Sequence, residues 1–191
     1  NISFDHISEP GTRLIKDPRV LLCNQMHLIE KEDGLGWINH PGFHNRINSS
    51  DIIFVARHCG YRIFEVYNAP SDGLVSEELR KQYGDFRPQT MEKLWDDVLK
   101  TGVIMFGAAC SDRHSIHDHV NNREAWNMVR LEARTLEEVT LEQVQTAFYS
   151  GDFYATGGIK LKDVKLEDKT YKISVDLEGT MSDILGLELK G

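Results

Sequence analysis

The chain has 191 residues and a formal net charge of −8, with 40% hydrophobic and 27% charged residues. This length allows one domain with a sizeable core, and the composition is ordinary for a globular protein. The acidic balance argues against general nucleic-acid binding, which needs clustered Lys and Arg, but a small phosphorylated substrate needs only a local positive field or a metal ion. No stretch approaches the length of a transmembrane helix, so we expect no membrane partner.

The cysteines Cys23, Cys59 and Cys110 occur singly in apolar surroundings. They form neither a CxxC pair nor an even set, so we expect buried, reduced side chains and no zinc ribbon or disulfide framework. Reduced cysteines favour a cytoplasmic location. No signal peptide is visible, and the chain opens inside a predicted strand without a leading Met, so we expect upstream residues to be missing.

Apolar runs predict short strands in the amino-terminal part of the chain, at residues 2–4, 19–29 and 35–43. The last of these stops at His40-Pro41, because proline breaks a central ladder. A helix is predicted at 49–60, with a polar cap at its start and a glycine at its end. A further strand is predicted where aromatic and β-branched residues concentrate, at 61–68.

The polar segment 69–91 predicts a loop, which leads into a helix at 91–102 and a buried strand at 103–109. A second capped helix is predicted at 140–151. From about residue 159 apolar and polar residues alternate around a turn near Glu167-Asp168-Lys169, which predicts a β-hairpin. The alternation of strands and helices before this tail indicates an α/β fold with mainly parallel strands.

Metal-competent side chains recur where the predicted strands end. They are Asp5 and His6, Gln25 and His27, His40, Glu65 and Asn68, and the run Ser111-Asp112-Arg113-His114. In barrels and open α/β sheets, the loops at the carboxyl ends of strands form active sites. Imidazole and carboxylate groups suit Zn, Mn or Fe, and Asp112 and His114 would share one face of an extended segment. The pattern therefore predicts a divalent metal site.

Several stretches resemble, in order, signatures of the PHP (polymerase and histidinol phosphatase) family of metal-dependent phosphoesterases. "ISFDHIS" is similar to a strand ending in Thr-Asp-His, "INHPGF" to the His-Pro motif, "IFEVYN" to a Glu-Val-x-Asn strand, "FGAACSDRH" to a strand ending in Ser-Asp-x-His, and "AFYSGDFYATGGIKLKDV" to a Gly-x-x-Tyr-x-Ser-x-Gly turn. The resemblance covers most of residues 2–165. It implies a distorted (β/α)7 barrel over residues 1–158, incomplete at its amino end, with an appended β segment at 159–191.

The resemblance also implies roles for individual residues. Two or three divalent ions would be bound by His6, His40, Asp112 and His114, with His27 as a further ligand. Arg113 or His114 would stabilise charge or protonate the leaving group. The residues around the metal or the substrate would be Asp5, Gln25, His44 and Glu65. Gln25 stands about where the family has a bridging Glu, and the family's opening His-x-His has no counterpart after Asn1.

The leading hypothesis is a hydrolase that uses metal-activated water on a small-molecule phosphoester, with an ester or carbamate substrate left open. The alternative is a degenerate PHP domain that acts as a non-catalytic structural or binding module, which Gln25 and the missing His-x-His favour. An amidohydrolase-like barrel would commonly need a metal-bridging Lys at a strand end, and no Lys is so placed. The sequence predicts no particular oligomeric state.

Overall fold

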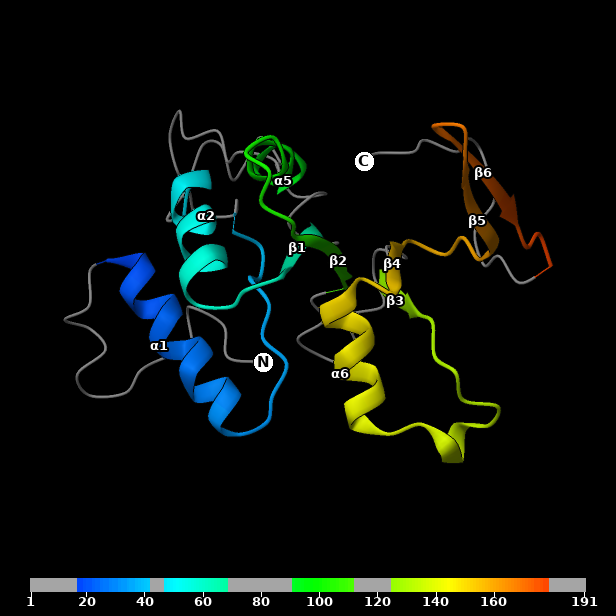
Figure 1. Ribbon diagram of the computed structural model, residues 1–191, viewed down its shortest axis with the longest axis horizontal. Helices are drawn as coiled ribbons and strands as arrows, with labels where there is room; N and C mark the ends of the chain where they lie inside the picture. Colours follow the sequence, from blue (N-terminus) through cyan, green and yellow to red (C-terminus); the bar gives the residue numbers. More distant parts are fainter. Residues whose placement is uncertain (1–16, 42–46, 69–90, 112–124, 179–191) are drawn as a thin grey trace, which may run out of the picture.

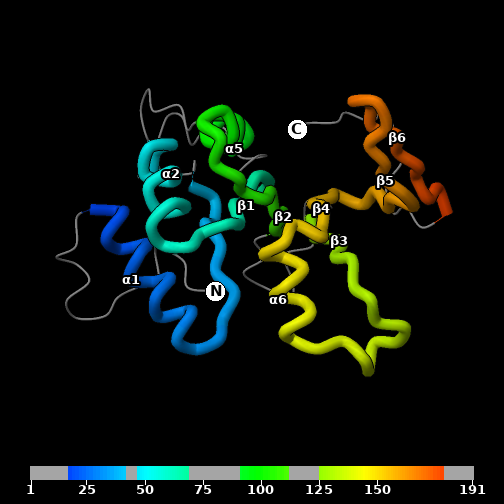
Figure 2. Tube along the Cα trace, viewed as in Figure 1, coloured from blue at the N-terminus to red at the C-terminus, as the bar shows by residue number. Residues whose placement is uncertain are grey.

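The computed structural model describes residues 17–41, 47–68, 91–111 and 125–178. Its elements are α1 (Pro18–Lys31), α2 (Ser49–His58), β1 (Ile63–Asn68), α5 (Met91–Leu99), β2 (Phe106–Cys110), β3 (Trp126–Val129), the 3₁₀ turn η2 (Leu136–Glu138), α6 (Leu141–Ser150), β4 (Phe153–Thr156), β5 (Leu161–Glu167) and β6 (Thr170–Val175). Helices α1 and α2 lie at one end, β1 and β2 lie near the centre, and the hairpin β5–β6 projects at the other end (Figure 1). The Cα trace in Figure 2 shows the long excursion that carries the chain from β3 to α6 before it returns to β4.

A short parallel ladder forms the centre of the molecule. Ile38 bridges Phe64 of β1, and β1 pairs in parallel with β2. Helix α2 connects Ile38 to β1, and α5 lies between β1 and β2 in the chain, as expected because parallel neighbours need crossover connections. The predicted order of strands and helices is therefore found between Ile38 and β2, although within residues 35–41 the strand predicted at 35–43 is reduced to the single bridge at Ile38.

The predicted (β/α)7 barrel is wrong. Within the described residues the strands form separate two-stranded sheets, β1–β2, β3–β4 and β5–β6, and no barrel closes. Beyond β2 the pairing becomes antiparallel. The side-chain amide of Asn127 in β3 takes the place of a strand partner for β2, since it accepts from the Ala109 N–H at 2.9 Å and donates to the Ala109 carbonyl at 3.0 Å. The chain is a mixed α/β fold in which the parallel ladder stops at β2.

The strand predicted at 19–29 is also wrong, because this segment is helix α1. The Asp17 side chain accepts a hydrogen bond from the Arg19 N–H at 2.9 Å, and Pro18 occupies the first turn. Both features start helices. The buried residues Leu22, Gln25 and Met26 recur at helical spacing on one face. An apolar run of this length suits either element, and here the cap decides between them.

The other predicted helices are confirmed. Asn48 and Asp51 form a capping box at the start of α2, and Thr140 and Gln143 form one at the start of α6. Helix α6 ends at Gly151, whose φ of 80° lies in the left-handed region that glycine adopts without strain. Helix α5 lies within the range predicted at 91–102.

The predicted hairpin is confirmed as β5–β6. Asp168 and Lys169 form its two-residue loop, with φ values of 47° and 65°. Positive φ at both central residues is typical of the tight hairpin turn whose twist matches the strands that it joins. The domain boundary predicted after residue 158 falls between β4 and β5.

The core lies among α1, α2, α5 and the ladder. Its most buried apolar members, at 0–2% exposure, include Met26, Ile38, Ile52, Val55, Tyr61, Phe64, Leu94, Val98 and Met105. A smaller cluster of Ile63, Ala108 and Phe148 joins α6 to the other face of the ladder. Both clusters include residues of β1, so this strand is buried on two sides.

Cys23 and Cys59 form a disulfide bond, so the prediction that all cysteines are reduced is wrong. The two residues are 36 positions apart in the chain, but α1 packs against α2 and brings their Cα atoms to 5.2 Å. The bond removes the observation on which the cytoplasmic prediction depended. None of the helices in the described ranges is long and apolar enough to cross a membrane.

Candidate functional site

Part of the predicted site lies outside the described residues. These positions are Asp5, His6, His44, Asp112, Arg113 and His114, and the strand predicted at 2–4 lies there as well. The described part of the predicted site consists of Gln25, His27, His40 and Glu65. The structure brings the last two together.

His40 and Glu65 meet at the carboxyl edge of the parallel ladder. The Glu65 N–H donates to the Ile38 carbonyl at 3.0 Å, which aligns the two segments. Two residues further on, the His40 N–H donates to the Glu65 Oε2 atom. His40 has a φ of 23° and precedes Pro41, so the chain turns away from the ladder at this point. The Glu65 carboxylate therefore holds the turn that carries His40.

Glu65 is 1% exposed, and its burial raises the pKa of its carboxyl group. The His40 N–H, the charge of His40, and hydrogen bonds with the side chains of Asn68 and Cys110 act in the opposite direction. Burial prevails, because a carboxylate removed from water is costly unless a cation or several donors compensate it. A cation at this edge of the ladder would stabilise the charged form of Glu65.

Further polar groups lie at the same edge. Asn68 is 0% exposed and stands opposite Cys110, the last residue of β2. The Asn39 Oδ1 atom is buried and has no hydrogen-bond partner among the described residues, so it can accept a further donor. Asn68 belongs to the predicted strand-end pattern, whereas Asn39 and Cys110 do not, although each also stands at or beside a strand end, and that position was the available signal.

The chain leaves β2 at this edge as well. Because β1 and β2 are parallel, Cys110 and Asn68 lie at the same end of the ladder. Ser111 follows, and Asp112 is the next residue in the sequence. The sequence thus leads directly from the edge that holds His40 and Glu65 into the predicted Asp112-x-His114 ligand pair.

The described residues alone do not make a complete metal site. Among them, no group of three or more His, Cys, Asp or Glu side chains is arranged to hold a metal ion. The edge nevertheless offers an imidazole, a carboxylate and an amide oxygen, which are donor types that suit Zn, Mn or Fe. The donors therefore fit a divalent ion, and further ligands would come from residues outside the described ranges.

Gln25 and His27 are not brought to this edge. Helix α1 places Met26 and Glu30 beside Gly60 and Arg62, in the wall of one groove. Gly60 and Arg62 precede β1, so this part of α1 lies near the amino end of the strand, whose length is roughly 16–20 Å. His27 is exposed on α1, while Gln25 is 7% exposed and faces the core.

The chain was compared with protein-family models, with curated proteins and with solved structures, and no match was found. The resemblance to the PHP family therefore depends on the sequence motifs themselves.

Proposed function

We propose that the carboxyl edge of the ladder binds a divalent metal ion and that the protein is a metal-dependent hydrolase of small-molecule phosphoesters. The proposal rests on the Glu65 carboxylate. This group is only 1% exposed, and it accepts a hydrogen bond from the main-chain N–H of His40. Buried carboxylates in proteins are usually paired, fully hydrogen-bonded or close to a metal. The carboxyl ends of parallel strands are also where α/β proteins place their ligands.

In this proposal His40, Asp112 and His114 are ligands, with His6 as a further one. Glu65 is a positioning residue, because its carboxylate accepts a hydrogen bond from the His40 N–H and so orients the turn that carries this ligand. Arg113 would bind the oxygens of the substrate phosphate, for which a guanidinium is well suited. A bound divalent ion would supply Lewis-acid stabilisation of the phosphoryl group and activation of water.

The test is metal binding and hydrolysis by the purified chain. We expect wild type loaded with Mn or Zn to retain at least about one ion per chain and to hydrolyse 4-nitrophenyl phosphate or its diester. Glu65→Gln keeps the size of the buried side chain and removes its charge, so the fold should persist. We expect this variant to bind the ion about 10- to 100-fold more weakly, as is usual when a group behind a ligand is changed.

The matched control is Glu132→Gln, the same exchange at an exposed position. It should bind metal and turn over substrate as wild type does. An Asp112→Ala/His114→Ala variant should lose the ion. If folded wild type takes up no Mn or Zn, or if Glu65→Gln and Glu132→Gln bind it equally well, the proposal is wrong.

The placement of Gln25 in α1 favours the second candidate, a non-catalytic binding module. Gln25 stands about where the family has a bridging Glu, but it lies on α1 near the amino end of the ladder, so it does not contribute a ligand at the carboxyl edge. The same experiment distinguishes the two candidates. Metal binding that depends on Glu65, together with no hydrolysis of either nitrophenyl substrate, would support the module.

A further inference from the structure

A groove lies near the amino end of the ladder, at the opposite end of β1 from His40 and Glu65. It is lined by Met26 and Glu30 of α1, by Gly60 and Arg62 just before β1, and by Tyr149 and its neighbours in the second half of α6. Its volume of about 740 Å³ falls in the range of roughly 300–1,000 Å³ that is usual for small-molecule sites. All of these residues belong to the described part of the chain.

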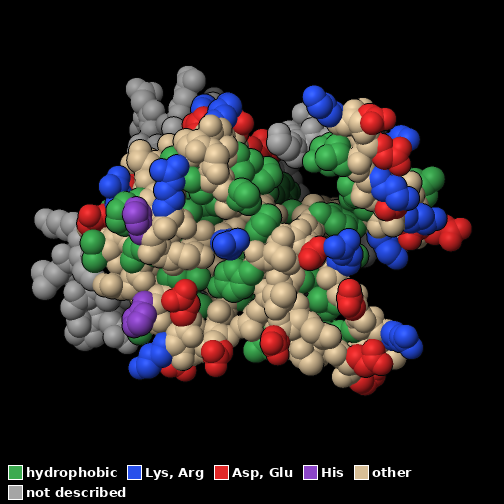
Figure 3. Space-filling model, viewed as in Figure 1, with side chains coloured by type: hydrophobic (Ala, Val, Ile, Leu, Met, Phe, Trp, Pro, Cys, Tyr) green, Lys and Arg blue, Asp and Glu red, His purple; other side chains and the backbone are tan. Residues whose placement is uncertain are grey.

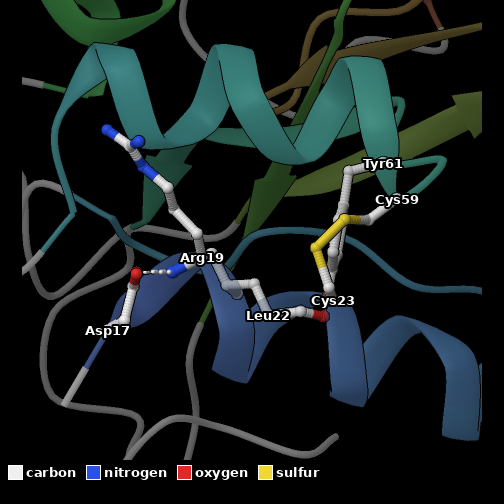
Figure 4. The surroundings of a disulfide bond; sticks show 6 residues. All are labelled: Asp17, Arg19, Leu22, Cys23, Cys59 and Tyr61. Atoms are coloured by element: carbon white, nitrogen blue, oxygen red, sulfur yellow. Dashed lines mark hydrogen bonds between the residues drawn. A yellow bond between two sulfur atoms is a disulfide. The ribbon is translucent and has the colours of Figure 1, made fainter. Parts of the chain in front are cut away.

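Two contacts hold the sides of this groove together. The Cys23–Cys59 bond joins the middle of α1 to the residue that precedes Gly60 (Figure 4). At the other side, the Gln145 side chain of α6 donates a hydrogen bond to the carbonyl of Asp33, across 112 positions of sequence. Gln145 and Asp33 both line the groove. A groove that is held open in advance binds a ligand at a lower cost in conformational entropy.

The groove contains opposite charges that do not neutralise each other. Glu30 and Asp33 contribute carboxylates, and Arg62 contributes a guanidinium. All three residues are exposed, and none of their side chains forms an ion pair or a hydrogen bond with another described residue. Glu30 also lies in the last turn of α1, where the main-chain carbonyls favour a cation. The groove therefore offers one position for a cation and another for an anion.

Apolar groups line the same groove. Met26 is 2% exposed and reaches it from the core, and the partly buried Tyr149 packs against the same core cluster. Tyr149 and Glu30 both contribute to the raised pKa of Tyr61, so the Tyr149 ring and the Glu30 carboxylate lie near the same phenol. An apolar surface beside a few charged groups is typical of sites for small amphipathic molecules.

We propose that this groove binds a small zwitterion with a primary ammonium group, a carboxylate and an apolar side chain, namely a free apolar amino acid or a short apolar peptide. The ammonium group donates to the Glu30 carboxylate, and the Arg62 guanidinium donates to the carboxylate of the ligand. The apolar side chain of the ligand lies against Met26 and Tyr149. This inference does not depend on metal binding at the carboxyl edge.

The experiment is isothermal titration calorimetry at neutral pH with L-leucine, L-phenylalanine and L-leucyl-L-leucine as probes. We expect at least one of them to bind with a Kd of about 1 mM or below. For each amino acid, two analogues that lack one charge serve as a comparison. For leucine these are 3-methylbutylamine and 4-methylpentanoate, and for phenylalanine 2-phenylethylamine and 3-phenylpropanoate. Each analogue should bind at least about 10-fold more weakly than its amino acid, because it leaves one charged group of the groove unpaired.

Glu30→Gln and Arg62→Gln each remove one charge from the groove and should weaken binding of the zwitterion by at least about 10-fold. Glu32→Gln and Arg57→Gln are the matched controls, since they make the same exchanges at exposed positions that do not line the groove. They should bind as wild type does. Circular dichroism and Tm establish that all four variants are folded.

Three results would overturn the inference. The first is that no probe binds wild type at concentrations up to about 10 mM. The second is that the amine and the carboxylate analogues bind as tightly as the amino acid. The third is that folded Glu30→Gln and Arg62→Gln bind the zwitterion as well as Glu32→Gln and Arg57→Gln do.

Discussion

The strand β1 and the hairpin β5–β6 are both short β structures, but different forces stabilise them. In β1, Ile63, Phe64, Glu65 and Asn68 are at most 1% exposed. In the hairpin, Val164, Leu166 and Tyr171 are 49%, 61% and 65% exposed. Charged side chains of both signs gather over the hairpin (Figure 3), where Lys172 pairs with Glu167.

The two regions differ in how far apart in the sequence their stabilising contacts are. Strand β1 is buried by residues far from it in sequence, whereas the hairpin owes its register to the tight turn at Asp168-Lys169 and to its own cross-strand pairs. An exposed two-stranded hairpin contributes little apolar burial to the rest of the fold. We therefore expect global stability to depend on the ladder and to be nearly independent of the hairpin.

The largest contrast is expected between aromatic side chains of the two regions. Phe64→Ala should lower the free energy of unfolding by about 3–5 kcal/mol, because it leaves a cavity in the core. Tyr171→Ala should lower it by less than about 1 kcal/mol, since the ring is 65% exposed. Urea unfolding followed by circular dichroism measures both. Equal losses would show that the hairpin is part of the cooperative unit.

A second contrast concerns how tightly α6 packs against β2. Gly151 has a φ of 80°, and a Cβ atom there would lie 2.3 Å from the Phe106 ring. Gly102 has a φ of 77°, and a Cβ atom there would meet no described residue within 4 Å. Gly102→Ala should cost about 1 kcal/mol from backbone strain alone. Gly151→Ala should cost about 3 kcal/mol, because overpacking adds to the strain. The same urea titrations measure this difference, and similar losses for the two variants would mean that the Phe106 ring moves aside easily.

The smallest expected effect is a pH dependence of the free energy of unfolding, which arises from Tyr61, two residues before β1. Burial, with smaller contributions from Tyr149 and Glu30, raises the pKa of Tyr61 above its usual value of 10.0. Below pH 10 the phenol is protonated in both the folded and the unfolded chain. Above it the unfolded chain releases its proton first, so the free energy of unfolding should fall by about 1.4 kcal/mol per pH unit from this group.

The measurement is urea unfolding between pH 8 and pH 11. Tyr61→Phe loses the hydrogen bond to Leu22, at about 1 kcal/mol, and should show a shallower decline above pH 10. Tyr171→Phe, the same exchange at an exposed position of the hairpin, should keep the decline of wild type. Parallel curves for all three proteins would contradict the assignment to Tyr61.

The sequence by itself determined the local features of this protein. The capping boxes at Asn48 and Thr140 start α2 and α6, and the turn at Asp168-Lys169 forms the hairpin, because these hydrogen bonds and φ angles involve residues close together in the chain. The strand-end pattern also anticipated that His40 and Glu65 would lie together. It could do so because successive parallel strands all end at one edge of a sheet.

Only the tertiary structure decided the rest. The local cap at Asp17 starts helix α1, but the packing of its Leu22 and Met26 face against the core depends on distant residues, and the apolar run alone also suits a strand. The Cys23–Cys59 bond depends on the packing of α1 against α2, across 36 positions of sequence. The end of the parallel ladder at β2, and the burial that raises the pKa of Glu65, likewise arise from neighbours distant in the chain. Such contacts form only when the whole core assembles, so no local pattern of residues records them.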